Sequence, residues 1–262
     1  MTGLIDIGVN LSHQSFDGDR EAVVARAKAV GVNRMIITGT EVGASEQAAE
    51  LAATRPGVFW STAGVHPHHS KELDSAGVTR LAALLNKEHV VAVGETGLDF
   101  FRNFSPPADQ IAAFRTQLEL AEATGLPLFL HQRDAHEQFL ELLTEFKGRI
   151  GAGVAHCFTG NEQQLHAYLE LDLYIGITGW ICDERRGQHL HDLVGDIPAD
   201  RLLLETDAPY LLPRNLAVKP KTRRNEPQFL IHVRDAVAAA TGKPPEQIAA
   251  ETSANAERLF GL

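Results

Sequence analysis

Eight short apolar runs recur along this chain of 262 residues, and segments with helical spacing separate most of them. A strand that alternates with a helix eight times over about this length is typical of a closed parallel barrel. The sequence therefore predicts an α/β fold, a TIM (β/α)8 barrel, as a single domain over residues 1–262. The runs are Leu4–Val9, Arg34–Thr38, Val58–Val65, Val90–Gly94, Leu126–Leu130, Ala152–Ala155, Leu173–Ile177 and Arg201–Leu204.

An open, doubly wound parallel sheet is the competing fold for the same alternation. Such a sheet normally carries a glycine-rich phosphate loop directly after its first strand. Gly3 and Gly8 do not make such a loop. This absence favours the barrel.

The helical segments carry start and stop signals. Ser105, followed by Pro106 and Pro107, predicts a helix that Ser105 caps, and Gly125 predicts its end. Its apolar face is expected at Ile111, Phe114, Leu118 and Ala121, which repeat at intervals of three and four.

Other gaps between the runs show weaker helical patterns. Val23, Ala27 and Val30 are expected to share one helical face, and Gly31 follows as a stop signal. Further helices are expected over Glu162–Leu171 and, as one or two helices, across Pro245–Phe260.

The net charge limits the kinds of molecule that this protein is expected to bind. The formal net charge of −10 argues against broad electrostatic binding to nucleic acid, which normally needs a basic surface. The stretch 214–224 is an exception, because it has five basic residues and no acidic one. It lies within Ala208–Pro227, the longest irregular segment, and loops of that length are usually functional or mobile.

The expected cellular setting is simple. No stretch approaches the ~20 apolar residues of a membrane helix, and no signal-peptide pattern precedes the first strand. Cys157 and Cys182 are expected to be reduced thiols. We therefore expect a cytoplasmic protein without membrane contact, and a monomer, since no oligomerisation signal is visible.

The run from Val90 leads directly into a carboxylate, Glu95, between Gly94 and the pair Thr96-Gly97. The run is continuous rather than alternating, as in a parallel strand buried on both faces. A charge at the end of such a strand is costly to bury without a partner. A metal ion shared with other strand ends would be such a partner.

Other strand ends deliver metal-ligand types. The carboxyl ends of barrel strands form one ring, where the chemistry of such folds takes place. A single histidine there is more often structural, but the conjunction of imidazoles and carboxylates suits divalent Zn, Mn, Fe or Mg. Bound metal lowers the pKa of water towards neutrality, which predicts a metal-dependent hydrolase. The strand-end residues are Asn10, His66, Glu95, His131, His156 and Asp207.

Six motifs in this order resemble the TatD family of metal-dependent deoxyribonucleases. A seventh match is the late segment Arg223-Arg224-Asn225-Glu226-Pro227. The six are Asp6-Ile7-Gly8-Val9-Asn10, Gly64-Val65-His66-Pro67-His68, Gly94-Glu95-Thr96-Gly97-Leu98-Asp99, His131-Gln132-Arg133, His156-Cys157-Phe158-Thr159-Gly160 and Glu205-Thr206-Asp207-Ala208-Pro209-Tyr210-Leu211.

The resemblance implies an amidohydrolase-type TIM barrel that hydrolyses phosphodiester bonds. The implied activity is a Mg²⁺-dependent 3′–5′ exonuclease on single-stranded DNA, with RNA as a further substrate and Mn²⁺ or Zn²⁺ as alternative ions. Glu95 would bridge two ions, with His131 and His156 on one and Asp207 on the other. Asp207 would also orient or deprotonate the attacking water, and His66 would contact the scissile phosphate.

Two positions depart from the pattern of most of the family. Gly8 and Asn10 stand where most members have a His-x-His pair. Asn10 offers only a neutral oxygen, which suits Mg²⁺ better than Zn²⁺. We therefore expect one well-held ion and a second ion that is held loosely or only with substrate.

Several further residues are candidates for contact with substrate. Arg133 either holds a phosphate or pairs with Asp134, Glu137 or Asp99. Arg223 and Arg224 either bind backbone phosphates or form a solvated surface. Base stacking or core packing are the alternatives for Phe101, Trp180 and Tyr210.

Two other functions remain compatible with this sequence. The same site could hydrolyse an ester or amide, such as a D-aminoacyl-tRNA, because a fold does not determine a substrate. A barrel that has lost metal binding and serves as an interaction protein is the other alternative. Its only support is the absence of the histidine pair near Asn10.

Overall fold

The computed structural model describes residues 3–262. Contacts group them into two compact units. The first unit comprises the chain up to Ile36, Cys157–Leu165 and Ile175–Leu262, and the second comprises Ile37–His156 and His166–Tyr174. The single domain expected from the sequence stays a prediction.

Eight strands form one sheet, and they follow one another in it in the order of the sequence. Helices alternate with them along the chain, so the predicted (β/α)8 fold class is confirmed. The strands are β1 (Leu4–Val9), β2 (Val32–Ile37), β3 (Phe59–Ala63), β4 (Val90–Asp99), β5 (Leu128–Arg133), β6 (Gly153–Ala155), β7 (Tyr174–Ile177) and β8 (Leu202–Leu204).

The main helices are α1 to α9, and short 3₁₀ turns lie between some of them, among them η2 (Pro67–Glu72). Among residues 3–262, no helix is both long and apolar enough to cross a bilayer. The helices are α1 (Arg20–Ala29), α2 (Val42–Ala53), α3 (Ser75–Leu85), α4 (Pro107–Thr124), α5 (His136–Glu145), α6 (Glu162–Glu170), α7 (Gln188–Leu193), α8 (Leu230–Thr241) and α9 (Pro245–Phe260).

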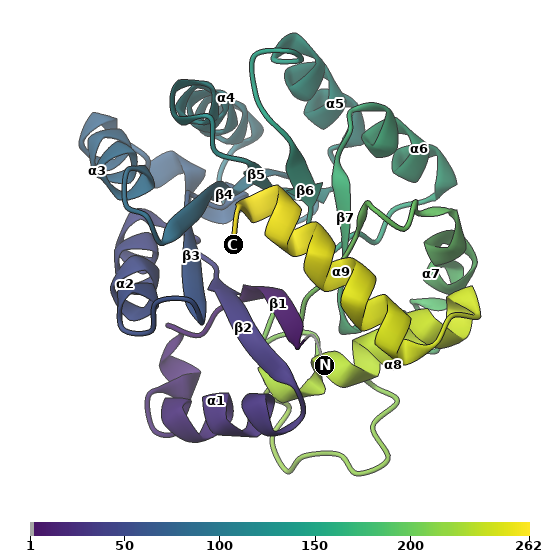
Figure 1. The fold of residues 1–262 in the computed structure, drawn as a ribbon. Coiled ribbons are helices and arrows are strands. Elements are labelled where there is room, and N and C mark those ends of the chain that lie inside the picture. Colours follow the sequence, from purple (N-terminus) through teal and green to yellow (C-terminus); the bar gives the residue numbers. More distant parts are fainter. Residues whose placement is uncertain (1–2) are drawn as a thin grey trace. The chain divides into compact units, whose positions relative to one another are not determined.

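In the first unit, β1 lies beside the end of β8. Val9 forms a parallel bridge with Ala208, and the Asp207 N–H donates to the Gly8 carbonyl. Helix α9 holds this region, because the Asn255 amide donates to the Leu202 carbonyl. Figure 1 shows α9 next to α8 in yellow and yellow-green.

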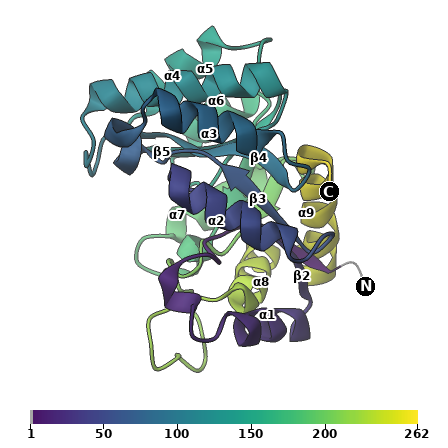
Figure 2. The same cartoon turned by 90° about the vertical axis from the view of Figure 1, so that its left-hand side faces the viewer.

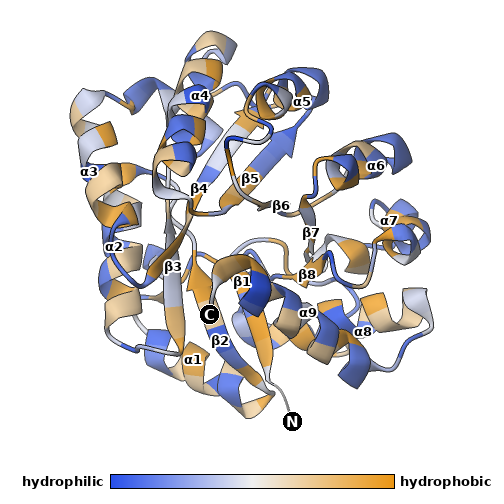
Figure 3. Cartoon of the chain, turned by 45° about the horizontal axis from the view of Figure 1, so that its top comes forward, coloured by the Kyte–Doolittle hydropathy of each residue, from blue (hydrophilic) through white to orange (hydrophobic). Residues whose placement is uncertain are grey.

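In the second unit, β3 to β6 pair in parallel, and α2 to α4 pack along the outside of β3 and β4 (Figures 1 and 2). Both faces of β4 are buried along its whole length, as its continuous apolar run predicts. Helix α5 instead carries separate hydrophobic and hydrophilic stripes (Figure 3). Its buried stripe includes Phe139, which stacks on Phe114 of α4 at 5.5 Å between ring centroids.

Helix α4 confirms its predicted extent and end, and Gly125 terminates it in the left-handed conformation. The predicted cap is wrong. Pro106 precedes the first turn, and the Ser105 hydroxyl instead donates to the His68 carbonyl, because Ser105 is buried and that carbonyl lies 2.9 Å away. Ile111 is half-buried, and two glutamines, Gln110 and Gln117, occupy the buried stripe beside the predicted apolar residues.

The first helix ends earlier than its pattern suggested. Val23 and Ala27 are buried as predicted. The prediction for Val30 is wrong, because Val30 lies beyond α1 at its C-cap and is 37% exposed.

Strand β4 is longer than predicted. It continues through Glu95 to Asp99, and all of its residues are buried. Its pairing with β5 shifts register between Gly94 and Thr96, so Glu95 sits at an irregularity within the strand rather than at its end. Gly97 pairs with His131, and Asp99 pairs with Arg133.

Candidate metal centre

Three imidazole nitrogens converge on one carboxylate oxygen in the second unit. The Oε1 atom of Glu95 lies 2.8 Å from His156 Nε2, 3.0 Å from His131 Nδ1 and 3.4 Å from His66 Nε2. His66 Nε2 and His131 Nδ1 are 3.3 Å apart. The structure therefore brings together three of the predicted site histidines around Glu95.

The strands place these side chains, and glycine makes the closest approach possible. Glu95 is anchored by its own N–H, which donates to the Gly39 carbonyl. Gly97 has a φ of +141°, and a Cβ there would lie 1.9 Å from the His131 carbonyl oxygen. Only glycine at this position lets β4 approach β5 closely enough.

Two buried glutamines of α4 hold the adjoining strand ends. Gln117 accepts the Val65 N–H and donates to the Val65 carbonyl, directly before His66. Gln110 makes the same pair of bonds with the N–H and carbonyl of Asp99. A polar residue on the buried face of α4 therefore sets the position of each of these strand ends.

Asp99 forms a second layer behind the histidines. Its Oδ2 lies 2.8 Å from His68 Nε2 and 3.6 Å from His131 Nε2. The 3.6 Å separation is an ion-pair distance rather than a hydrogen bond. Asp99 Oδ1 accepts the N–H groups of Phe101 and Arg102. A carboxylate behind a ligating histidine fixes the orientation of its ring.

The histidines stabilise the charge of Glu95. Burial would raise the pKa of Glu95, but the attraction of His156 and hydrogen bonds from His131 and His156 hold that pKa well below its usual range. Burial lowers the pKa of His66, which keeps its ring neutral. Burial would also lower the pKa of His131, but the facing carboxylates of Asp99 and Glu95 raise it overall.

A divalent ion fits these donors. Ligands about 2.0–2.2 Å from one ion, in tetrahedral or octahedral arrangement, lie about 3–3.5 Å from one another. The ligand atoms of His66, Glu95 and His131 all lie within 4.8 Å of one another. His131 offers Nδ1 to this group of donors, while its Nε2 faces the Asp99 carboxylate on the other side of the ring.

A backbone contact determines which ring nitrogen of His66 carries the proton. Its Nδ1 accepts the His68 N–H at 3.1 Å. A nitrogen that accepts carries no proton, so in the neutral ring the proton lies on Nε2, which faces Glu95. By distance His66 belongs to the ligand group. Its tautomer instead favours donation of a hydrogen bond, which suits the contact with the scissile phosphate that the family resemblance implies.

Asp207 and Asn10 form a separate pair in the first unit. The Asn10 amide donates to Asp207 Oδ1 at 3.0 Å. Strand β8 ends at Leu204, and Asp207 has a φ of +54°, so strand alternation does not govern where its side chain points. Glu205 is buried and accepts the N–H of Cys157. A shared ion for Asp207 and the Glu95 group stays a prediction.

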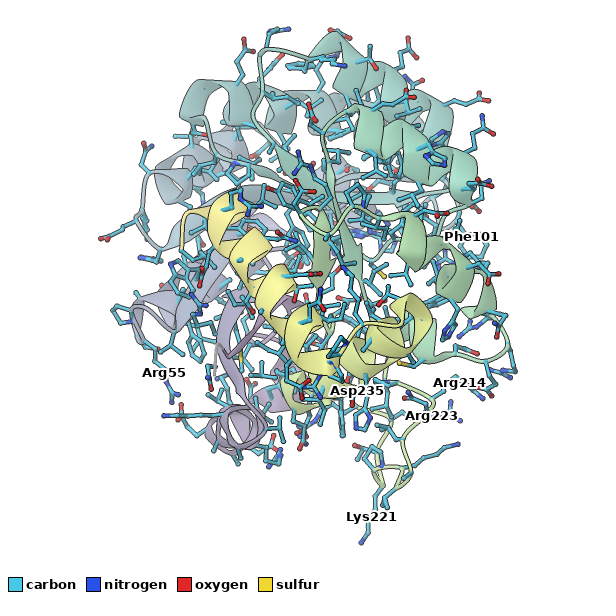
Figure 4. All side chains as sticks on the ribbon, turned by 45° about the vertical axis from the view of Figure 1, so that its right-hand side comes forward. Arg55, Phe101, Arg214, Lys221, Arg223 and Asp235 are labelled. Carbon is cyan, nitrogen blue, oxygen red and sulfur yellow. The ribbon has the colours of Figure 1, made fainter. Side chains whose placement is uncertain are left out.

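The predicted substrate-binding arginines differ in their surroundings. Arg133 forms none of the expected salt bridges among residues 3–262, and its guanidinium lies 3.9 Å from the centre of the Phe101 ring. Arg224 is bound by Asp19 and Glu226, and this pairing lowers the pKa of Asp19 to about 2. Arg223 is exposed on the irregular loop, near Lys221 at the tip of that loop (Figure 4).

Sequence reasoning missed the roles of Asp99 and Phe104. Asp99 had a detectable signal. In a strand, residues at i, i+2 and i+4 share a face, so extending the run to Asp99 would have placed it with Glu95. No comparable signal pointed to Phe104, which depends on the loop conformation.

Comparison with known proteins agrees with this geometry. The sequence pattern of the TatD related DNase family matches residues 5–261. The chain belongs to this family. A relative from Erwinia billingiae, named 3′-5′ ssDNA/RNA exonuclease TatD, is 52% identical over 259 residues, which are 99% of each chain. The exonuclease of the same name from Salmonella typhimurium is 52% identical over 257 residues, or 98% of each chain.

Solved structures of the TatD family share the fold. The crystal structure of a TatD homologue from Escherichia coli K12 matches with a TM-score of 0.90 and 29% identity. The match covers 99% of this chain and 98% of the homologue. This agreement over the whole length supports the (β/α)8 assignment and the metal-dependent hydrolase type predicted from the strand ends.

Proposed function

We propose that this protein is a metal-dependent 3′–5′ exonuclease that hydrolyses phosphodiester bonds in single-stranded DNA and RNA. The observation that carries the proposal is the convergence of three imidazole nitrogens on Glu95 Oε1 at 2.8–3.4 Å. Family membership supports the substrate class. A cytoplasmic location and a monomeric state stay predictions.

Glu95, His131 and His156 would hold the first ion. Mg²⁺ is the expected ion, with Mn²⁺ or Zn²⁺ as alternatives. Asp207 would hold a second ion with help from Asn10, whose neutral oxygen makes that site weaker. When bound, the ions would lower the pKa of coordinated water and neutralise charge on the phosphate.

The protein's own groups have distinct expected tasks. His66 donates its Nε2 proton in a hydrogen bond to an oxygen of the scissile phosphate, since its Nδ1 is occupied by the His68 N–H. Asp207 accepts the proton of the attacking water. Arg133 and Arg223 bind flanking phosphates. Arg224 has the same predicted role, but it would have to exchange protein carboxylates for phosphate.

End-labelled oligonucleotides test this proposal. Purified protein with Mg²⁺ should shorten a single strand from its 3′ end, and EDTA should stop the reaction. His131→Ala and Asp207→Asn should each lose the activity, whereas His69→Ala, a partly exposed histidine of the same unit, should retain it. Full activity in His131→Ala or Asp207→Asn would contradict the assignment. Cleavage of aminoacyl esters alone would favour the alternative D-aminoacyl-tRNA hydrolase.

A further inference from the structure

Two exposed phenyl rings stand on the loop between β4 and α4. Phe101 is 54% exposed and Phe104 is 57% exposed. Phenylalanine is among the residues most often buried, so two exposed rings within four positions leave apolar area in contact with water. A group of exposed apolar side chains on a folded protein commonly marks a binding surface.

This loop is held at both of its ends. The Asp99 carboxylate accepts the N–H groups of Phe101 and Arg102, and the Ser105 hydroxyl donates to the His68 carbonyl. The Asn103 amide closes the turn by donating to the Phe100 carbonyl at 2.6 Å. The backbone that carries the two rings is therefore held in place before any ligand binds, which reduces the entropy lost on binding.

The rings adjoin the candidate metal centre. Phe104 contacts His68 edge-to-face, with 4.7 Å between ring centroids. His68 in turn lies 4.3 Å from the His66 ring and bonds to Asp99. One imidazole therefore separates Phe104 from His66, whose Nε2 faces Glu95. A polynucleotide with its scissile phosphate at the centre would have its neighbouring nucleotides within reach of this loop.

Two arginines lie beside the rings with their charges unpaired. The Arg133 guanidinium lies over the Phe101 ring, 3.9 Å from its centre, and the Arg102 guanidinium lies 5.7 Å from the same centre. Within residues 3–262, neither guanidinium forms an ion pair with a carboxylate, in contrast to Arg80 and Arg115 of the same unit. A stacked guanidinium leaves its N–H edge free to bind phosphate.

We propose that Phe101 and Phe104 form a stacking platform for the bases of the substrate strand, while Arg102 and Arg133 bind its phosphates. The proposal rests on the proposed exonuclease function and specifies how a single strand is selected. Bases of a single strand can present their faces to aromatic side chains, whereas those of a duplex are already stacked on one another. Such a platform binds all bases with little sequence preference.

Binding without metal tests the platform independently of catalysis. The probes are a fluorescein-labelled ten-nucleotide single strand and a strand of equal length whose sugars lack bases, both measured by anisotropy in EDTA. Wild type should bind the strand with bases more tightly. Phe101→Ala and Phe104→Ala should each weaken that binding by about 5- to 150-fold, corresponding to the loss of one stacked base, and leave the abasic strand unaffected.

Matched variants separate stacking from apolar contact and from charge. Phe101→Leu and Phe104→Leu keep the apolar bulk and should behave like the alanine variants, whereas Phe104→Trp should retain binding. Arg102→Ala should weaken both strands equally and reduce the salt dependence. Arg55→Ala, which removes an arginine of the same unit far from Phe101 in Figure 4, should change neither.

Hydrolysis kinetics with Mg²⁺ supply a second readout. The phenylalanine variants should raise KM for the strand with bases at nearly constant kcat, as expected for uniform binding. Equal binding of both strands by wild type would overturn the platform even if the nuclease activity is confirmed. Loss of activity on the abasic strand in the alanine variants, or a change in their oligomeric state, would also overturn it. A wild type that cleaves neither strand would contradict the exonuclease, and the binding data would still decide the platform.

Discussion

At the scale of single residues, the candidate centre depends on which groups stand behind its histidines. Asp99 is 1% exposed and faces both His68 and His131. Burial would raise its pKa, but the nearby His131 imidazole and hydrogen bonds from His68 and backbone N–H groups hold it well below its usual range. Asp99 is therefore an anion that can orient the His131 ring without being a ligand itself.

We predict that Asp99→Asn lowers the affinity for Mn²⁺ by about 10- to 100-fold, as is typical for loss of a carboxylate behind a metal-binding histidine. Isothermal titration calorimetry of metal-free protein measures this. Asp134→Asn is the control, because Asp134 is exposed and its φ of +53° suits asparagine. Equal affinities of Asp99→Asn and wild type would show that Asp99 is not needed to position His131.

Asp6 provides a prediction about pH. It is fully buried in the first unit, and burial raises its pKa to about 7 despite hydrogen bonds from Thr206 and Gly8. The folded protein therefore keeps a proton on Asp6 between about pH 4 and pH 7, where the unfolded chain has lost it. Stability from this group should fall as pH rises through that window and level off above about pH 7.

The comparison of wild type with Asp6→Asn isolates this effect, because other titrations cancel. Relative to the variant, wild type should lose on the order of 4 kcal/mol of stability from pH 4 to pH 7.5. Urea unfolding at several pH values measures the difference. A difference that is constant with pH would mean that Asp6 titrates near its ordinary pKa.

At the scale of elements, β4 and α4 together build the second unit's site. The register shift after Gly94 places Glu95 at an irregular point of the strand. Two glutamines from α4 then hold the chain beside His66 and at Asp99. The position of Glu95 along β4 and the packing of α4 are therefore both needed to place the side chains of this site.

Gly97 and Gly125 provide a matched pair for testing strand approach. Both have positive φ, but a Cβ at Gly97 would meet the His131 carbonyl, whereas nothing lies within 4 Å of a Cβ at Gly125. Gly125→Ala should lower the free energy of unfolding, measured with urea, by about 1 kcal/mol, because only the backbone conformation becomes less favourable. Gly97→Ala should lower the free energy of unfolding several times more and should weaken metal binding. Equal losses of unfolding free energy in the two variants would contradict the close approach of β4 to β5.

At the scale of the whole molecule, metal binding should be linked to folding. The proposed ion binds only where strands have brought Glu95 and the histidines together, so it should stabilise the folded state. At 100 times the dissociation constant the gain should be about 2.7 kcal/mol. Thermal unfolding with Mn²⁺ and with EDTA should show a higher midpoint with the metal. Glu95→Gln should remove the difference, and a persistent shift would place the ion elsewhere.

Activity should also respond to metal beyond one equivalent. The resemblance to the family implies an imidazole at the position of Asn10, and the neutral oxygen of Asn10 would hold a second ion more weakly. We therefore expect the initial rate of digestion to keep rising at Mg²⁺ concentrations well above that of the protein. A rate that saturates at one equivalent would exclude the weak second site.

Local patterns in the sequence were sufficient for the architecture. Eight apolar runs and the period of α4 are properties of neighbouring residues, and hydrophobic burial acts on them wherever they lie. The strand-end histidines His66, His131 and His156 and the carboxylate Glu95 could likewise be found, because a parallel sheet brings its carboxyl ends to one edge. The convergence of these four side chains in one unit agrees with that expectation.

Only the tertiary structure decided how the site is supported. The extension of β4 to Asp99 and the position of Phe104 against His68 depend on contacts between residues about three dozen positions apart. Ser105 shows the same limit, because its hydroxyl bonds to a distant carbonyl instead of capping the adjacent helix. Sequence patterns indicate which residues can be buried. The hydrogen-bond partner of a buried polar group depends on which residues lie beside it in the folded chain.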